Sequence, residues 1–302
     1  MARMTLLAVP YLLLAIQAPP PPNKPDSGTL RTRVEARIAQ APARAVGVYY
    51  RDLTTGDSLT VGSAVRFHAA STMKLPVMIQ LFRDRDAGLL KLDDSVTVTN
   101  TFRSIVDSSP YQLDPSDDSD STLYKRNGQR VSIRQLIELM ETVSSNLATN
   151  LLIDRVGAKR ANATAHALGA DSILVLRGVE DGKAFTAGLN NTTTARDLGV
   201  LLAAIATDKA ASPQSCRDML AILGRQQFKE GIPAGLPPGT TVYHKTGWIT
   251  QIYHDAAIVE PASGQGKRYV LVVLTGGIQK DEDAHALVRD ISSIVYDAWR
   301  KR

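Results

Sequence analysis

The sequence predicts an α/β fold of the α+β class, in which an antiparallel sheet is flanked by N- and C-terminal helices and carries an inserted all-helical lobe. Three observations predict it: a helix and two strands open the folded part, capped helices fill the middle, and three strands with a periodic helix close the chain. Because strands from both ends of a chain can join one sheet, the helices between them are an insertion. The 302 residues are 44% apolar, enough to bury a real core.

Two segments are expected to precede the folded part. A single Arg is followed by an apolar run from about Thr5 to Ile16, which is shorter than the ~20 apolar residues of a membrane span. We therefore expect residues 1–18 to be a signal peptide and the prolines of 19–26 to form a linker. The protein is then exported, periplasmic or secreted, without a stable membrane span after processing. An uncleaved N-terminal membrane anchor is the alternative.

The folded domain is expected to span residues 27–302. It begins with a periodic helix around Leu30 to Ala39, and "AVGVYYRDLTTGDSLTV" then reads as two strands joined by a polar Gly turn. "TTVYHKTGW", "YHDAAIVE" and "KRYVLVVLTGG" read as strands near the other end, and "DAHALVRDISSIVYDAWRK" has helical spacing. The expected lobes are an α/β lobe of about 27–70 and 213–302, and a helical lobe of about 71–212.

The helices of the middle are recognised by their ends. Ser or Thr followed three residues later by Gln or Asp is a capping box, Pro is favoured at the first helical position, and Gly commonly ends a helix. These signals are Ser132 with Gln135, Thr194 with Asp197, Ser212 before Pro213, and Gly157.

Composition excludes several classes of function. The net charge is +5, but basic residues are interleaved with acids and form no stripe for nucleic acid. Cys216 is the single cysteine, so there is no internal disulfide, and the five histidines lack the spacing of a zinc site. We expect no metal, no cofactor and no nucleic-acid partner, and a monomer. The acidic stretch "DPSDDSDS" lacks the pattern of a calcium loop and is expected to be a solvated surface loop.

Three short motifs and one acid point to chemistry. Ser71 precedes Lys74 by three residues in "STMK", "SSN" places Ser144 and Asn146 where two predicted helices meet, and "KTG" covers 245–247 on a predicted strand. Glu180 lies in a polar connection with glycines. Each alone has an ordinary structural explanation, and for Ser71 it is a helix N-cap.

The opening pair has the chemistry of an activated nucleophile. A serine hydroxyl reacts poorly until a base takes its proton, and residues three apart on a helix lie on one face. Lys74 is protonated at its ordinary pKa of about 10.4, so it needs burial or a second cation to become a base. Lys245 is a candidate for that second cation.

Together, and in this order, the motifs resemble the class A β-lactamases, serine hydrolases that share their fold with penicillin-binding transpeptidases. The resemblance covers roughly residues 28–302. It implies a class A-like serine β-lactamase that hydrolyses the β-lactam amide through an acyl-enzyme. The implied roles are Ser71 as nucleophile, Lys74 as its possible base, Ser144 as proton relay, Asn146 as substrate holder, Lys245, Thr246 and Gly247 as carboxylate-recognition strand, and the N–H groups of Ser71 and Trp248 as oxyanion hole.

The sequence departs from the family pattern at four places. Ser145 stands where the second motif has Asp, so a carboxylate that holds the local backbone is missing. Trp248 replaces a small residue and either narrows the cleft or packs against the sheet. The arginine that follows the third motif is absent, and His254 is either its stand-in, charged if Asp255 raises its pKa, or a packed strand histidine.

The fourth departure concerns release of the acyl group. The family carries a Glu three residues before a Leu-Asn pair, whereas here Glu180 follows Arg177 at a different spacing and Leu189 is distant. Glu180 is the candidate base that activates water, Asp181 is its rival, and both are solvated loop acids in the alternative. If the alternative holds, the protein acylates but releases β-lactams poorly, as a penicillin-binding protein or DD-peptidase does on cell-wall peptides.

Two other functions compete with this one. "GDSL" at 56–59 names a different esterase family whose nucleophile would be Ser58, but the expected Asp-x-x-His is not formed before His285, and a strand turn explains Gly56 and Asp57. A non-catalytic β-lactam-binding sensor module that kept the fold and the acylatable serine is also compatible with the sequence.

Overall fold

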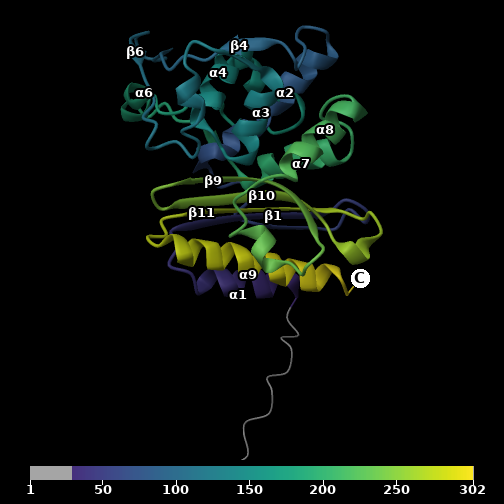
Figure 1. Cartoon of the computed structure of the whole chain (residues 1–302). Helices are drawn as coiled ribbons and strands as arrows, with labels where there is room; N and C mark the ends of the chain where they lie inside the picture. Colours follow the sequence, from purple (N-terminus) through teal and green to yellow (C-terminus); the bar gives the residue numbers. More distant parts are fainter. Residues whose placement is uncertain (1–28, 302) are drawn as a thin grey trace, which may run out of the picture.

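Strands from both ends of the chain form one antiparallel sheet in the computed structural model, which describes residues 29–301 (Figure 1). The predicted signal peptide (1–18) and the predicted linker (19–26) lie outside the described residues. The sheet order is β2-β1-β11-β10-β9, which confirms the predicted antiparallel sheet. Its strands are β1 (Ala45–Asp52), β2 (Ser58–Val61), β9 (Thr241–Ile249), β10 (Ile252–Glu260) and β11 (Tyr269–Gly276).

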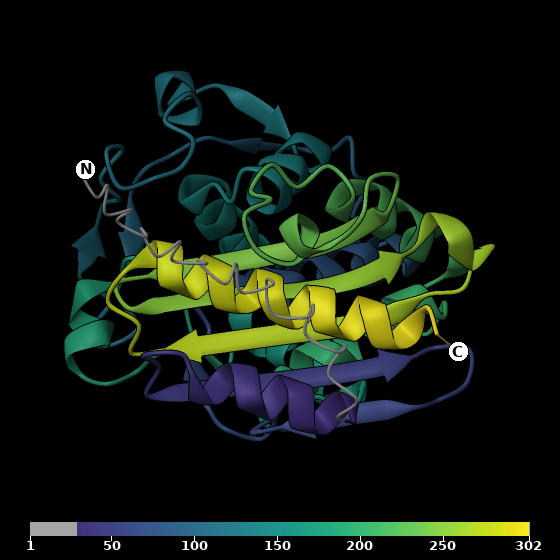
Figure 2. The same cartoon turned by 90° about the horizontal axis from the view of Figure 1, so that it is seen from below.

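Helices cover both faces of this sheet. α1 (Leu30–Ala39) and α9 (Asp281–Trp299) lie side by side on the lower face, as Figure 2 shows from below. On the other face α7 (Ala195–Ala206) packs against β1, β10 and β11, and the helical lobe lies above it (Figure 1). The terminal helices therefore flank the sheet as the sequence predicts.

The apolar run of β11 is explained by this double cover. Val270 and Val272 belong to the core that the sheet shares with the helical lobe, whereas Leu271 and Val273 belong to the core under α9. Successive strand residues point to opposite faces, so a strand buried on both sides is apolar throughout.

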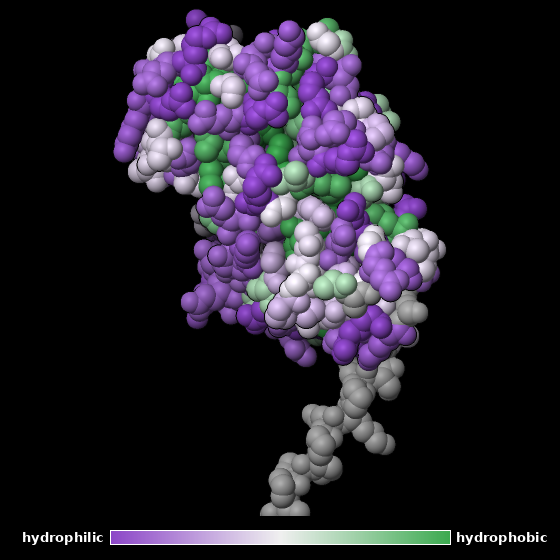
Figure 3. Space-filling view, turned by 45° about the vertical axis from the view of Figure 1, so that its right-hand side comes forward, coloured by the Kyte–Doolittle hydropathy of each residue, from purple (hydrophilic) through white to green (hydrophobic). Residues whose placement is uncertain are grey.

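On the face in Figure 3, hydrophilic residues cover most of the surface and hydrophobic residues are exposed in smaller areas.

The helices of the lobe begin and end where the sequence predicts. Ser132 accepts the N–H of Gln135 at 3.2 Å, and Thr194 accepts that of Asp197 at 3.1 Å. Gly157 follows α4 with a φ of 80°. The helices are α2 (Lys74–Asp86), α3 (Ile133–Thr142), α4 (Asn146–Val156), α5 (Ala158–Ala167), α6 (Gly182–Thr186), α7 and α8 (Pro213–Leu223), with 3₁₀ turns η1 (Ala70–Met73), η2 (Leu123–Arg126), η3 (Ile232–Gly235) and η4 (Ala262–Gly264) elsewhere in the described chain.

Short strand pairs accompany these helices and were not predicted. Each strand has two or three residues, too few for a periodic pattern. The pairs are β3 (Phe67–His68) with β8 (Thr192–Thr193), β4 (Ser95–Thr97) with β7 (Arg130–Ser132), and β5 (Phe102–Arg103) with β6 (Pro110–Tyr111).

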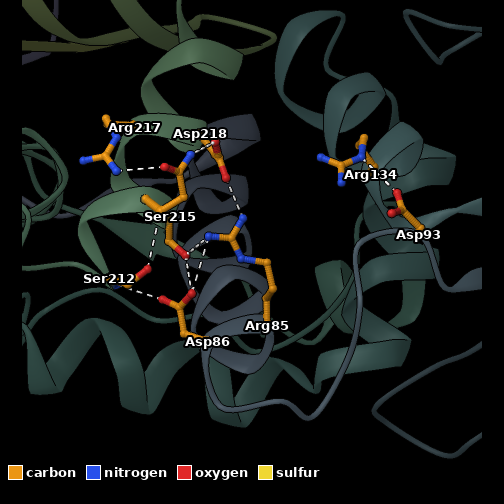
Figure 4. A network of polar contacts seen from close by, with 9 residues as sticks. Arg85, Asp86, Asp93, Arg134, Ser212, Ser215, Arg217 and Asp218 are labelled. Atoms are coloured by element: carbon orange, nitrogen blue, oxygen red, sulfur yellow. Dashed lines mark hydrogen bonds and ion pairs between the residues drawn. The ribbon is translucent and has the colours of Figure 1, made fainter.

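Polar contacts tie the end of α2 to the start of α8 (Figure 4). Arg85 donates to Asp218 and Ser215, and Asp86 accepts from the hydroxyl of Ser215 at 2.6 Å and from the N–H of Ser212 at 2.8 Å. α8 also packs on α3 and on β9, so it contacts both lobes. The lobe boundary near residue 213 stays a prediction. Within residues 29–301 no helix is both long and apolar enough to span a bilayer.

Candidate active site

Ser71 lies on the turn η1 and lines a cleft. The cleft has a volume of about 650 Å³, and Asn146, Glu180 and Trp248 line it too. η1 has no side-chain capping bond, so the helix-cap explanation of Ser71 is wrong. The residue before it, Ala70, has a φ of 45°, a left-handed conformation that is unfavourable for a residue with a Cβ. Such strain is concentrated at functional sites.

The end of β9 closely approaches the backbone of Ser71. A Cβ built on Gly247 would lie 2.9 Å from the Ser71 nitrogen and 3.0 Å from the Thr72 nitrogen. The first distance is shorter than real Cβ contacts and the second is tighter than nine in ten of them, and both neighbours are backbone atoms, so glycine fits this approach best. It brings the strand that continues into Trp248 beside the first N–H groups of the turn.

Lys74 is fully buried and bonded to the second motif. Its Nζ donates to the Ser144 carbonyl at 2.7 Å, to Ser144 Oγ at 3.1 Å and to Asn146 Oδ1 at 3.0 Å. Burial lowers the pKa of Lys74 far below its ordinary value, and the charge of Lys245 lowers it further. The nearby acids oppose this shift without reversing it. Lys74 therefore gives up its proton more readily than an exposed lysine does.

Ser144 connects the two lysines. Lys245 Nζ also donates to Ser144 Oγ at 3.1 Å, so this oxygen accepts from a lysine Nζ on each side. Both of its lone pairs are then occupied, and its own proton must point to a third partner. Ser144 is 2% exposed and has a φ of 61°, a second strained residue in the site.

Lys245 and Thr246 lie below the surface of the cleft. Both are fully buried, and burial lowers the pKa of Lys245 to about 8. Thr246 Oγ1 has no hydrogen-bond partner among the described residues. Trp248 is 40% exposed, and its ring packs edge-on against Phe228 with centroids 4.9 Å apart. Its ring thus has a packing partner while it also lines the cleft.

Asn146 bridges Lys74 and Glu180. Its Oδ1 accepts from Lys74, and its Nδ2 donates to Glu180 Oε1 at 2.8 Å. Glu180 Oε2 accepts the N–H of Asp114 at 3.3 Å, and burial raises the pKa of Glu180 above its ordinary value. The Glu180 backbone has a φ of 62°. Its carboxylate lines the cleft beside Ser71.

Asp181, the rival of Glu180, has its side chain occupied elsewhere. It caps α6 by accepting the N–H of Ala184 at 3.0 Å, and it accepts the Ser104 hydroxyl at 2.9 Å and the Ile105 N–H at 3.0 Å. At 1% exposure it is a buried structural acid. The alternative in which both acids are solvated is wrong for this residue.

His254 is a packed strand histidine. It is fully buried, and its ring nitrogens lie 2.9 Å from the carbonyls of Tyr253 and His68. Burial lowers its pKa to about 4, so it is neutral at pH 7. Asp255 pairs with His244 at 2.9 Å instead. His254 therefore cannot replace the missing arginine as a cation.

The competing signatures have structural explanations. Gly56 has a φ of 81° in the turn between β1 and β2, and Ser58 begins β2 on the surface. The ring of His285 packs edge-on against Tyr253, with centroids 4.4 Å apart. In residues 29–301 no group of His, Cys, Asp and Glu could hold a metal ion.

Comparisons with known proteins agree with this geometry. A sequence model described as the β-lactamase enzyme family matches residues 29–299. The chain belongs to the β-lactamase enzyme family. A β-lactamase of Bacteroides uniformis is 26% identical over 263 residues, which are 81% of this chain and 83% of that protein.

Solved structures show the same fold. The structure of PBP-A superposes on this chain with a TM-score of 0.78 at 30% sequence identity. The matched region covers 93% of this chain and 99% of the PBP-A chain. A β-lactamase from Sphaerobacter thermophilus superposes with a TM-score of 0.76 at 27% identity, and the match covers 90% of this chain and 98% of that protein's chain. The predicted superfamily of β-lactamase and penicillin-binding serine hydrolases is thus confirmed, and a β-lactamase-like function is supported.

Sequence reasoning does not identify two buried acids near the site of this β-lactamase family member. The expectation of a solvated surface loop is wrong for Asp118, which is 9% exposed and accepts the N–H groups of Asn146 and Leu147. Glu141 is 1% exposed, and neither of its oxygens has a hydrogen-bond partner in the described chain. Burial raises its pKa to about 7, against the attraction of the two lysines. Its position four residues after the buried Ile137 was the available signal.

Proposed function

We propose that the protein is a class A-like serine β-lactamase that hydrolyses the β-lactam amide through an acyl-enzyme on Ser71. The observation that carries the proposal is the bridge of Ser144 Oγ to two buried lysines, at 3.1 Å each, in the cleft that Ser71 and Glu180 line. An ordinary helix junction does not need two buried lysines, because burying a polar or charged amino group is costly.

In the first half-reaction Ser71 Oγ attacks the lactam carbonyl and its proton passes to neutral Lys74. The lowered pKa of Lys74 supports this role. The oxyanion is stabilised by the N–H groups of Ser71 and Trp248, as the family resemblance implies, and the close approach of Gly247 to the Ser71 nitrogen supports this role.

The lactam nitrogen then leaves with a proton from Ser144. Both lone pairs of the Ser144 hydroxyl face the lysines, so its proton is directed elsewhere. As Ser144 gives this proton to the nitrogen, Lys74 returns the one it took from Ser71. The C–N bond breaks, the acyl group stays on Ser71, and Lys74 is neutral again.

In the second half-reaction Glu180 takes a proton from a water that attacks the ester. The bond from Asn146 Nδ2 orients its carboxylate, and the pKa raised by burial makes it a stronger base than a free glutamate. Lys245 and Thr246 contribute the charge and hydroxyl for the substrate carboxylate, as the family resemblance implies.

The second candidate is a penicillin-binding protein that releases the acyl group slowly. The 30% identity with PBP-A favours it, and a variant of that protein has been solved as an acyl-enzyme complex with penicillin G. The natural substrate would then be a cell-wall peptide. Export to the periplasm or beyond, and a monomeric state, fit either candidate and stay predictions.

The two candidates are separated by turnover of a chromogenic cephalosporin. We expect sustained hydrolysis by the wild type and none by Ser71→Ala. Asp181→Asn is the matched control, because Asp181 is the neighbouring acid but does not contact the lysines or Asn146. A single burst equal to the enzyme concentration would favour the penicillin-binding protein. No burst and no turnover would overturn both.

A further inference from the structure

Asp118 is a buried carboxylate that the catalytic steps above do not use. It lies in the loop 114–121, and both of its oxygens are occupied. The N–H of Asn146 donates to them at 3.0 and 2.9 Å, and that of Leu147 donates at 2.9 Å. The hydroxyl of Tyr124 donates to Oδ2 at 2.9 Å. A loop acid with four such bonds is held in one place.

These contacts complete the N-terminus of α4. Asn146 and Leu147 are its first two residues, whose N–H groups have no partner within a helix. Asp118 accepts both, and Ser145 Oγ accepts the third, from Ala148, at 3.3 Å. The cap is therefore built from two side chains, one local and one from 28 residues earlier in the chain. The negative charge of Asp118 also faces the positive end of the helix dipole.

One of the residues held in this way, Asn146, contacts Lys74 directly. The side chain of Asn146 forms hydrogen bonds with Lys74 and Glu180. Ser144, two residues earlier, forms hydrogen bonds with both lysines. Ser144 has a left-handed backbone, which persists only where its surroundings hold it. A shift of the Asn146 main chain would move both contacts together.

We propose that Asp118 is a positioning residue for catalysis, which fixes Ser144 and Asn146 against the lysines and supplies from a distant loop the carboxylate that Ser145 lacks. This inference rests on the proposed function of the same site. The residues on either side of Asp118 in the chain, Asp117 and Ser119, line the cleft.

The first test compares two acids of this loop. Asp118→Asn keeps the shape but turns an NH₂ group toward backbone donors, so acylation by penicillin, followed by intact mass, should slow by about 10–100-fold. Asp120→Asn is the control: Asp120 is equally buried at 9%, its side chain forms hydrogen bonds only with Thr122, and its backbone N–H, which donates to Asp118, is kept in the variant. It should acylate as the wild type does, whatever its melting temperature. Equal rates for Asp118→Asn and wild type would overturn the proposal.

The second test moves the carboxylate. Ser145 Oγ lies 3.5 Å from Asp118 Oδ2, so Ser145→Asp in the wild type places two negative charges together and should slow acylation. In the Asp118→Asn background the same substitution restores a single carboxylate and should raise the rate. A purely structural loop contact gives additive losses instead, which would overturn the proposal.

A readout without substrate separates this proposal from the proposed function. Hydrogen exchange of the Asn146 and Leu147 amides should accelerate in Asp118→Asn and return toward the wild-type rate in the double variant. If the wild type forms no adduct with penicillin, the proposed function fails. The positioning proposal is then judged by exchange alone, and unchanged exchange overturns it.

Discussion

Gly247→Ala tests the close approach of β9 to Ser71. The new methyl would lie 2.9 Å from the Ser71 nitrogen and 3.0 Å from the Thr72 nitrogen, whereas ordinary contacts begin at 3.4 Å. Relief requires a displacement of about 0.5 Å. Both obstacles are backbone atoms, so the strand or the turn must move. Overpacking of this kind costs about 1–3 kcal/mol of unfolding free energy.

The larger effect is expected on acylation. Misplacement by 1 Å can cost 10²-fold in rate, so a shift of about half that size should slow acylation of Ser71 by about 10-fold or more. The assay is the rate of adduct formation with penicillin, with urea unfolding measured in parallel. Gly276→Ala on β11 is the matched control, because its methyl would meet only the Phe67 ring at 3.5 Å. Acylation of Gly247→Ala at the wild-type rate would refute the reasoning.

Three further predictions concern buried acids and a lysine. The pKa of Glu141 rises from 4.5 to about 7 on folding, so its destabilising effect grows as the pH rises through this range. The free energy of unfolding in urea is measured at about pH 5 and pH 8. The stability of Glu141→Gln relative to the wild type should increase by up to about 3 kcal/mol from pH 5 to pH 8. An equal difference between the two proteins at both pH values would contradict this. Lys245 loses its charge above about pH 8, so the KM for a carboxylate-bearing β-lactam should rise from pH 7 to 9.5, and a constant KM would exclude a charged role. Asp181→Ala removes the α6 cap and the acceptor of the Ser104 and Ile105 donors, so thermal unfolding should show a loss of at least about 1 kcal/mol while acylation stays unchanged. Slower acylation would place Asp181 in the chemistry.

Much of the fold is predictable because its signals are local. Caps such as Ser132 and Thr194 act through the next three residues, and the apolar run of β11 reports cover on both faces. The paired strands β4 and β7 are three residues each and lie 35 residues apart, so no local pattern marks them. Their pairing depends on tertiary contacts.

The residues of the site also fall into two groups, those marked by local sequence motifs and those whose role depends on tertiary contacts. Ser71, Lys74 and Lys245 are found from short motifs, and the structure brings their elements together. Asp118 acts across 28 residues on the backbone of Asn146, and an acidic stretch gives no sign of a buried acceptor. The partner of a buried carboxylate is set by the fold, so its role is visible only in three dimensions.

The most direct measurement of the central proposal is the mass of Glu180→Gln after incubation with penicillin. Ser71 should be acylated normally, because Lys74 and Ser144 are intact, and the ester should persist, because the base that activates water is lost. We predict a stable adduct on the peptide that contains Ser71 in this variant, and rapid return to the free mass in the wild type. An adduct that is equally stable in both proteins would show that the chain captures β-lactams without releasing them. That result would contradict the proposed β-lactamase function.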